Sequence, residues 1–174
     1  MKKVFGYPEF SAEGERVLCT YDNEYSDMLM DVRVYRMKAG TTRTFQRTGE
    51  ETAVLLLSGK IRYEWEGNAE TVSRKDVFTE GPWCVHVCTG TAVKVTAQED
   101  SELLVQCTHN DREFPAKLYK PEDAPWGYSC VGKFGNVAKR RVNTIFDHDI
   151  APYSNMVLGE VLNDRGNWSG YLPH

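Results

Sequence analysis

The 174-residue sequence lacks the features typical of membrane-spanning and nucleic-acid-binding proteins. No apolar run approaches the roughly 18 residues that a membrane-spanning helix requires. Acidic residues outnumber basic ones, 25 to 21, and the resulting net charge of −4 argues against nucleic acid or an anionic membrane as the main partner. The one basic triplet is Lys139-Arg140-Arg141, which we interpret as a solvated loop.

A secretory signal and a disulfide framework are also missing. Lys2 and Lys3 are followed by Pro8 and Glu9 without an intervening apolar region, so no signal peptide is expected. The five cysteines are an odd number at irregular spacing, which favours reduced thiols. We therefore expect a cytoplasmic protein.

Helical periodicity is scarce, and glycines instead divide residues 40–86 into short apolar segments. Residues 53–57 are apolar on both faces, as in a strand that is buried on both sides. After an expected turn at Ser58-Gly59, residues 60–65 alternate between charged and apolar side chains, which indicates a half-buried strand. Short strands with frequent turns predict an all-β barrel or sandwich.

Further strands are expected before and after this region. In the alternating segment 28–37, we predict that Val32 and Val34 face the core while Asp31 and Arg33 face outward. The remaining predicted strands cover residues 83–88, 92–96, 103–107, 141–146 and 156–162.

Proline and glycine divide the chain into parts. We assign residues 1–118 to a first barrel that begins with an N-terminal arm, residues 119–139 to a Pro/Gly-rich connector, and residues 140–174 to the start of a second barrel. An offset that places Met30 on Met156 also places Gly40 on Gly166, which indicates an internal repeat.

From Gly40 to Gly59 the spacing fits the pattern G-x5-H-x-H-x3-E-x6-G. This pattern resembles the first motif of the cupin superfamily, small β-barrels in which an H-x-H pair aims two imidazoles at a metal. Here the ligand positions hold Gln46, Thr48 and Thr52, which are poor ligands for a divalent transition metal. His86 falls at the later histidine position. We therefore expect a first barrel without a metal site.

Four segments carry a closer resemblance: RKDVF at 74–78, RRVNTIF at 140–146, GEV at 159–161 and GNWSGYLPH at 166–174. They resemble the 5-deoxy-glucuronate isomerase family of myo-inositol catabolism, which is related to the 5-keto-4-deoxyuronate isomerases. The resemblance covers the N-terminal two thirds of such a protein. It implies an all-β bicupin, with the first barrel complete, the second incomplete, and a divalent metal (zinc or manganese) held by the second barrel.

The resemblance implies an aldose–ketose isomerisation of a deoxy-uronic acid, in which a metal polarises oxygen atoms while a base moves the proton. His174 matches the first histidine of the metal-binding pair, and the partner ligands are absent from this sequence. Because one imidazole does not hold a catalytic metal, we expect no bound metal and no activity in this chain. The alternative is a non-catalytic cupin that binds a small sugar acid or acts as an assembly module.

Four residues are candidates for a sugar-acid pocket: His86, Glu160, Trp168 and Tyr171. Each also has a simpler interpretation. His86 is a hydrogen-bonded core histidine in that view, Trp168 and Tyr171 are packing residues, and Glu160 is an outward residue on an edge strand. An incomplete second barrel exposes strand edges and apolar surface, so we also expect a homo-oligomer.

Overall fold

The computed structural model describes residues 8–170, whose regular structure consists of β-strands and three short 3-10 turns. No helix within this range is long and apolar enough to cross a membrane. Nine strands form one antiparallel sheet: β1 (Glu15–Cys19), β2 (Asp31–Met37), β3 (Thr42–Phe45), β4 (Glu50–Trp65), β5 (Asn68–Arg74), β6 (Trp83–Val87), β7 (Val93–Ala97), β8 (Ser101–His109) and β9 (Lys117–Tyr119). We call this part the first unit. The all-β prediction is confirmed.

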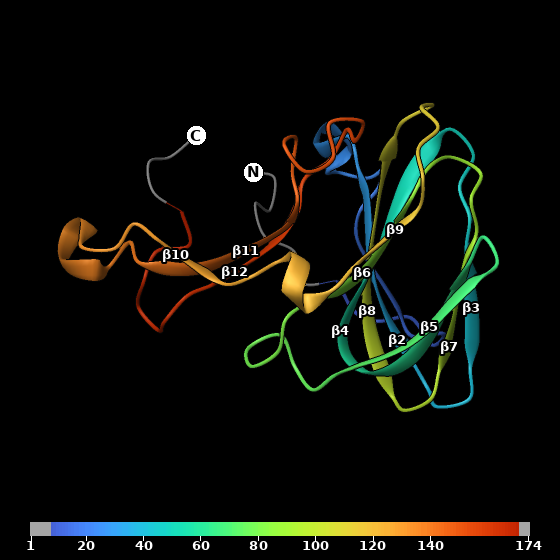
Figure 1. The fold of residues 1–174 in the computed structure, drawn as a ribbon, viewed down its shortest axis with the longest axis horizontal. Helices are drawn as coiled ribbons and strands as arrows, with labels where there is room; N and C mark the ends of the chain where they lie inside the picture. The colour runs from blue at the N-terminus through green and yellow to red at the C-terminus, as the bar shows by residue number, and fades with distance from the viewer. Residues whose placement is uncertain (1–7, 171–174) are drawn as a thin grey trace.

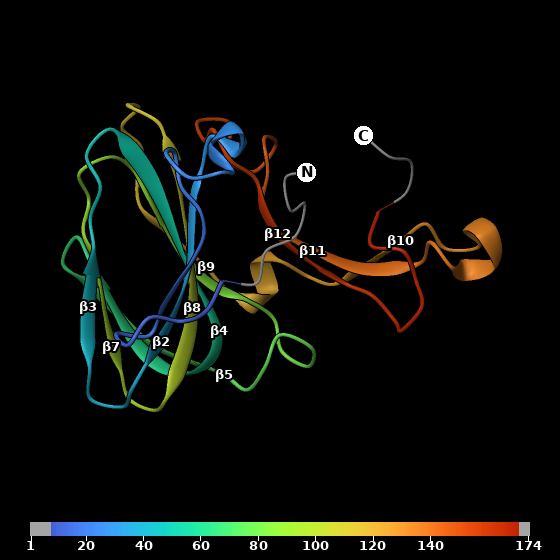
Figure 2. The ribbon, with the colours of Figure 1, turned by 180° about the vertical axis from the view of Figure 1, so that it is seen from behind.

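A separate three-stranded sheet follows and is called the C-terminal sheet. It contains β10 (Gly127–Ser129), β11 (Arg140–Phe146) and β12 (Leu158–Leu162), in the order β10-β11-β12. Figures 1 and 2 show it extending outward from one side of the first unit. Short 3-10 turns at Ser26–Met28, Pro121–Asp123 and Lys133–Asn136 lie in the connections.

The nine-stranded sheet folds into two layers, and the long strand β4 runs from one layer into the other. Its first half pairs with β6 and β8, and its second half pairs with β5 and β7. The turn predicted at Ser58-Gly59 is wrong, because the strand continues through a bulge there. Gly59 has φ +103°, and a Cβ on it would lie 2.3 Å from Ser101 Oγ and 2.6 Å from the carbonyl oxygen of Asp100. Glycine permits both the bend and the close approach of β8.

The apolar run at residues 53–57 is buried on both faces because it separates two cores. Val54 and Leu56 face the space between the two layers, and Ala53 and Leu55 face the chain that leads into the C-terminal sheet. Residues from the C-terminal part of this outer core are Ala124, Ile145, Phe146, Ala151, Met156 and Leu158. Each fully buried aliphatic side chain contributes about 1.5–3 kcal/mol, so the outer core attaches the C-terminal sheet to the first unit.

The prediction that Val32 and Val34 lie on the inner face of β2 is wrong. Tyr35 and Met37 belong to the inner core, so the face that also carries Asp31 and Arg33 points inward. Val34 lies on the opposite face and is also buried. Because β2 is covered on both faces, alternation alone does not identify the inner one.

The expected irregular segments contain three strands. Residues 15–19, predicted to be part of an arm, form β1 and pair with β2. Within and beside the predicted connector, β9 pairs with β6 and β10 pairs with β11. The first sheet therefore extends to Tyr119, and the C-terminal sheet begins at Gly127.

Two antiparallel strand pairs, β1–β2 and β11–β12, share the same register. Both contain an irregularity at the same step. The matching rungs are Glu15–Tyr35 with Val142–Val161, Arg16–Val34 with Asn143–Glu160, Val17–Arg33 with Thr144–Gly159 and, past the irregularity, Cys19–Val32 with Phe146–Leu158. The offset that relates β2 to β12 is the one that places Met30 on Met156. The internal repeat indicated by the sequence therefore extends to strand pairing.

Candidate functional site: a polar seam between the two sheets

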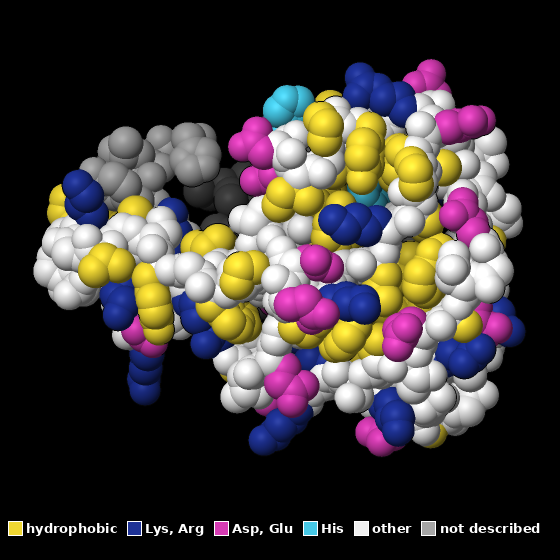
Figure 3. All heavy atoms as spheres, viewed as in Figure 1, with side chains coloured by type: hydrophobic (Ala, Val, Ile, Leu, Met, Phe, Trp, Pro, Cys, Tyr) yellow, Lys and Arg dark blue, Asp and Glu magenta, His cyan; other side chains and the backbone are white. Residues whose placement is uncertain are grey.

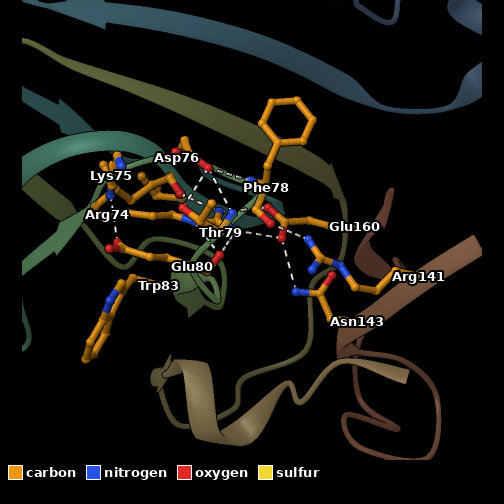
Figure 4. A network of polar contacts seen from close by, with 12 residues as sticks. Arg74, Lys75, Asp76, Phe78, Thr79, Glu80, Trp83, Arg141, Asn143 and Glu160 are labelled. Atoms are coloured by element: carbon orange, nitrogen blue, oxygen red, sulfur yellow. Dashed lines mark hydrogen bonds and ion pairs between the residues drawn. The ribbon is translucent and has the colours of Figure 1, made fainter. Parts of the chain in front are cut away.

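A buried ion pair joins β5 to the C-terminal sheet, and we call it, with its neighbours, the polar seam (Figure 4). The Arg74 side chain is fully buried, and its Nη1 and Nη2 each donate to one carboxylate oxygen of Glu160 at 2.7 Å. Asn143 on β11 donates its Nδ2 to Glu160 Oε2 at 3.1 Å. This two-pronged geometry is the strong form of an arginine–carboxylate contact.

The remaining Arg74 donors bind backbone carbonyls. Nη1 donates to the carbonyl oxygen of Leu56 at 2.9 Å, and Nη2 and Nε donate to that of Glu80 at 2.9 and 3.3 Å. The five N–H groups of the guanidinium are therefore all used. Arg74 and Glu160 act as a structural clamp, and this arrangement does not favour sugar binding by Glu160.

The Asp76–Glu80 loop presents the carbonyl group that Arg74 binds. Asp76 Oδ1 accepts the backbone N–H groups of Phe78 and Thr79 at 2.8 and 2.9 Å. The Thr79 hydroxyl also donates to Asp76, and this hydrogen bond is the largest cause of the lowered pKa of the Asp76 carboxyl group. The loop is thus held in one shape by a short acidic side chain, as in other Asx turns.

A small hollow lies beside the polar seam, with a volume of about 220 Å³. Its lining comes from the Asp76–Glu80 loop and from the C-terminal sheet with its connections: Phe78, Tyr128, Lys139, Arg140, Arg141, Leu162, Asn163 and Asp164. The basic triplet Lys139-Arg140-Arg141, interpreted from the sequence as a solvated loop, lines this hollow. We call it the seam hollow.

The Gly166–Gly170 segment forms hydrogen bonds with the connection that precedes β11. Asn167 donates its Nδ2 to the carbonyl oxygens of Lys139 and Asn136 at 3.0 and 3.3 Å. The backbone N–H of Trp168 donates to the carbonyl oxygen of Val137 at 2.8 Å. The indole ring packs against Phe134 with centroids 5.4 Å apart, and Trp168 is 48% exposed. This part of the resembling segment therefore anchors the chain.

His86 is a buried core histidine on the outer face of β6. Its Nε2 lies 2.9 Å from Glu51 Oε2, and both side chains are fully buried. The backbone N–H of Asn155 donates to Glu51 Oε1 at 2.6 Å, and the His86 ring stacks on Phe146 at 4.3 Å. The interpretation as a hydrogen-bonded core residue is confirmed. The side chain points away from the interior because Val85 and its alternate neighbours occupy the inner face.

The other motif positions do not converge on a metal. Gln46 and Thr48 are exposed, and Gln46 donates its Nε2 to the carbonyl oxygen of Gly90 at 2.7 Å. Thr52 is buried, with its Oγ1 3.5 Å from the Sγ of Cys107. Within residues 8–170, no three His, Cys, Asp or Glu side chains are grouped so that they could hold a metal ion. The donor chemistry of these residues does not fit a catalytic divalent metal.

Two arginines, Arg33 and Arg47, neutralise the carboxylate of Asp31 on the inner face of β2. Asp31 accepts Nε and Nη2 of Arg33 at 2.6 and 2.7 Å, and Nη2 of Arg47 lies 3.3 Å away. Arg33 also pairs with Glu15 at 2.8 Å, and this hydrogen bond is the main reason that the pKa of Glu15 is lowered. Burial raises the pKa of Tyr35 to about 12. These contacts explain why Asp31 and Arg33 are tolerated on an inner face.

The described pocket candidates lie in separate environments. His86 is in the outer core, Glu160 in the polar seam and Trp168 against Phe134. Tyr171 and His174 lie outside the described residues. Sugar binding by the four pocket candidates and metal binding by His174 stay predictions. The burial of Arg74 and Glu51 was not predicted from the sequence. The signal that could have indicated it is a charged residue next to an apolar strand, as Glu51 is next to residues 53–57.

The fold and site define an all-β protein in which a repeated strand pair is clamped to the first unit by a buried arginine–carboxylate pair. A solved IolB-like protein from Salmonella typhimurium LT2 shares this fold, with a TM-score of 0.70 and 20% identity over 79% of this chain and 52% of that chain. The KduI/IolB family model matches residues 6–174, and the chain belongs to this family.

Two curated relatives are named 5-deoxy-glucuronate isomerase. The protein from Bacillus subtilis (strain 168) is 28% identical over 148 residues, which cover 83% of this chain and 53% of the relative. The protein from Geobacillus thermodenitrificans (strain NG80-2) is 32% identical over 147 residues, which cover 81% and 51%. The chain spans about half the length of the curated relatives that it matches.

Proposed function

We propose that this chain provides the first barrel and the opening strands of a second barrel in a bicupin isomerase of a deoxy-glucuronate-type sugar acid. The observation that carries this proposal is the shared register of β1–β2 and β11–β12. Membership of the KduI/IolB family and the names of the curated relatives support the reaction class. The reaction is an aldose–ketose interconversion in myo-inositol catabolism, in a cytoplasmic protein.

The exposure of the C-terminal sheet agrees with this proposal. Tyr35 on β2 faces the inner core, and Val161 occupies the matching rung of β12. Val161 is 47% exposed and Val157, two alternations along the same face, is 63% exposed. The opposite face, with Glu160 and Asn143, packs on the first unit. The exposed face is thus the one that a second barrel would enclose.

The described residues have a positioning role in this proposal. The Arg74–Glu160 clamp holds β12, and Glu51, paired with His86, accepts the backbone N–H of Asn155 in the connection between β11 and β12. A bound zinc or manganese ion would polarise the sugar oxygens, and ligands other than the described residues would hold it. We therefore propose that the 174-residue chain alone does not turn over the sugar acid.

A fusion protein tests this function. The part of the Bacillus subtilis relative that lies beyond the match is joined to the end of this chain, and conversion of 5-deoxy-glucuronate is followed by NMR with zinc or manganese present. We expect turnover by the fusion and none by the chain alone. A folded, metal-loaded fusion without turnover, or turnover by the chain alone, would contradict the proposal; circular dichroism and light scattering verify folding.

The second candidate function is a non-catalytic module that binds a sugar acid or supports assembly. The replacement of the motif ligands by Gln46, Thr48 and Thr52 favours it. A folded fusion that binds a sugar acid but does not convert it would support this candidate instead.

A further inference from the structure

We propose that the seam hollow binds one monosaccharide that carries a carboxylate group, with Arg141 and Lys139 facing the carboxylate. This inference rests on the proposed function for the substrate class, and on the residues of the hollow for the position. Three residues that line the seam hollow, Tyr128, Arg141 and Leu162, lie on the face of the C-terminal sheet that also carries Asn143 and Glu160. This face is opposite to the exposed face, with Val161, that the second barrel would enclose.

Among residues 8–170, Arg141 is held in place without an acidic partner. Its guanidinium carbon lies 3.7 Å from the centre of the Trp126 ring, and its Nη2 donates to the carbonyl oxygen of Phe78. None of the ion pairs among the described residues includes Arg141 or Lys139. With respect to the part of the chain that the structure describes, stacking and one backbone contact leave the other N–H groups of Arg141 available, so a carboxylate would meet an already ordered guanidinium.

Lys139, which also lines the seam hollow, is positioned by two contacts. Its Nζ lies 4.5 Å from the centre of the Tyr128 ring, and its carbonyl oxygen accepts the Nδ2 of Asn167 at 3.0 Å. Tyr128 pairs with Arg141 across β10 and β11, which places both side chains on one face. Tyr128 is 64% exposed, so part of the ring is available to the apolar face of a sugar.

The polar residues of the seam hollow favour a hydroxylated carboxylate over a plain inorganic anion. Asn163 and Asp164 are exposed lining residues: the Asn163 amide can donate to or accept from sugar hydroxyls, and the Asp164 carboxylate can accept from them. The Asp164 carboxylate also repels a compact dianion such as phosphate. The volume of about 220 Å³ is below the lower limit of about 300 Å³ for drug-sized ligands, which suits one monosaccharide.

The charge of the seam hollow contrasts with that of the whole chain. The protein has a net charge of −4, yet three cationic side chains and one acidic side chain line this hollow. Figure 3 shows hydrophobic and basic side chains next to one another on the C-terminal sheet, at the left of the view. This local excess of positive charge attracts a carboxylate.

The test is a titration of the 174-residue chain with D-glucuronate, followed by protein-observed NMR. D-glucose is the uncharged probe of the same shape, and inorganic phosphate is the probe without a sugar ring. The variants are Lys139→Gln, Arg141→Gln and, as a matched control, Arg62→Gln at an exposed position on β4. We expect glucuronate binding that weakens about tenfold in the first two variants, as for a lost charged hydrogen bond, and is unchanged in the third.

Absence of glucuronate binding, equal binding of glucose or phosphate, or binding that Lys139→Gln and Arg141→Gln leave unchanged would overturn this inference. Lys139→Gln removes no contact to the first unit, so it remains informative if Arg141→Gln does not fold. Turnover by the fusion protein is measured separately. Turnover with no glucuronate binding at the seam hollow would reject this inference and leave the proposed function standing.

Discussion

Arginine neutralises buried or half-buried carboxylates at two places in this protein. Arg74 binds Glu160 in the polar seam, and Arg33 binds Asp31 and Glu15 at the inner end of β2. A buried ion pair adds little net stability relative to an apolar pair, but removal of one partner leaves a charge without compensation. Each set of ion pairs therefore favours one packing of the strands that it joins: β5 with β12 for Arg74–Glu160, and β1 with β2 for Arg33 with Glu15 and Asp31.

Arg74→Ala is expected to destabilise the chain by about 3–5 kcal/mol, because Glu160 loses its charged partner and the carbonyl groups of Leu56 and Glu80 lose the Arg74 donors. The control is Lys38→Ala, which removes a pair with Asp100 whose side chains are 84% and 62% exposed, and little change is expected there. Urea denaturation monitored by tryptophan fluorescence measures both. Equal changes in the two variants would show that the clamp is not stabilising.

Glu15 is expected to make folding sensitive to acid. Its pKa is lowered in the folded protein, mainly by the hydrogen bond from Arg33. Its contribution is therefore present above the usual glutamate pKa of about 4.3 and lost as the pH falls through the lower folded value. Glu15→Gln should reduce the difference in unfolding free energy between pH 6 and pH 3. The exposed Glu70→Gln serves as the control, and an identical difference in both variants would contradict the assignment.

Residue types alone predicted less of the site than of the fold. His86 was identified as a core histidine from its apolar surroundings, whereas its partner Glu51 is a charged residue that only tertiary packing buries. Asp31 and Arg33 were placed outward because single charges avoid interiors. Their mutual contact, together with Arg47, reverses that expectation, and such pairing is not visible in local alternation.

Strand β4 is the element that unites the first unit, and Gly59 is where it bends between layers. Strand positions were predictable because apolar runs and alternation depend on local sequence. The continuity of β4 was not, because Ser58-Gly59 has turn composition while the partner strand β8 keeps the ladder extended. Strand β1 was missed for a related reason, since its pairing with β2 supplies the order that its own pattern does not show.

Gly59→Ala is expected to cost about 1–3 kcal/mol from the left-handed backbone alone, and more from the contact with Ser101 and Asp100. Gly67→Ala is the matched control, since Gly67 has φ +77° and a Cβ added there would meet no atom within 4 Å. Thermal unfolding by circular dichroism compares the two. A Gly59→Ala variant as stable as Gly67→Ala would mean that the close approach of β8 is not required.

At the scale of the whole molecule, the C-terminal sheet has apolar side chains on its surface that no other described part of the chain covers. Within the described residues β12 pairs only with β11, and Val157 and Val161 are exposed on its outer face. Open edges and apolar patches favour association with further strands. A homo-oligomer stays a prediction that this surface supports.

Light scattering of the purified chain is expected to show a dimer or larger species. Val161→Lys should shift it toward the monomer, because a charge on this face opposes burial. Val131→Lys, at an exposed position in the connection before β11, is the control and should leave the association state unchanged. A wild-type chain that stays monomeric throughout a concentration series would contradict the prediction.

The proposed function assigns to the described residues the positioning of a second barrel, and within residues 8–170 no three His, Cys, Asp or Glu side chains are grouped so that they could hold a metal ion. The direct measurement is the metal content of the 174-residue chain, by mass spectrometry, after equilibration with zinc or manganese and desalting. We predict well below one ion per chain. One tightly bound ion per chain would contradict this prediction.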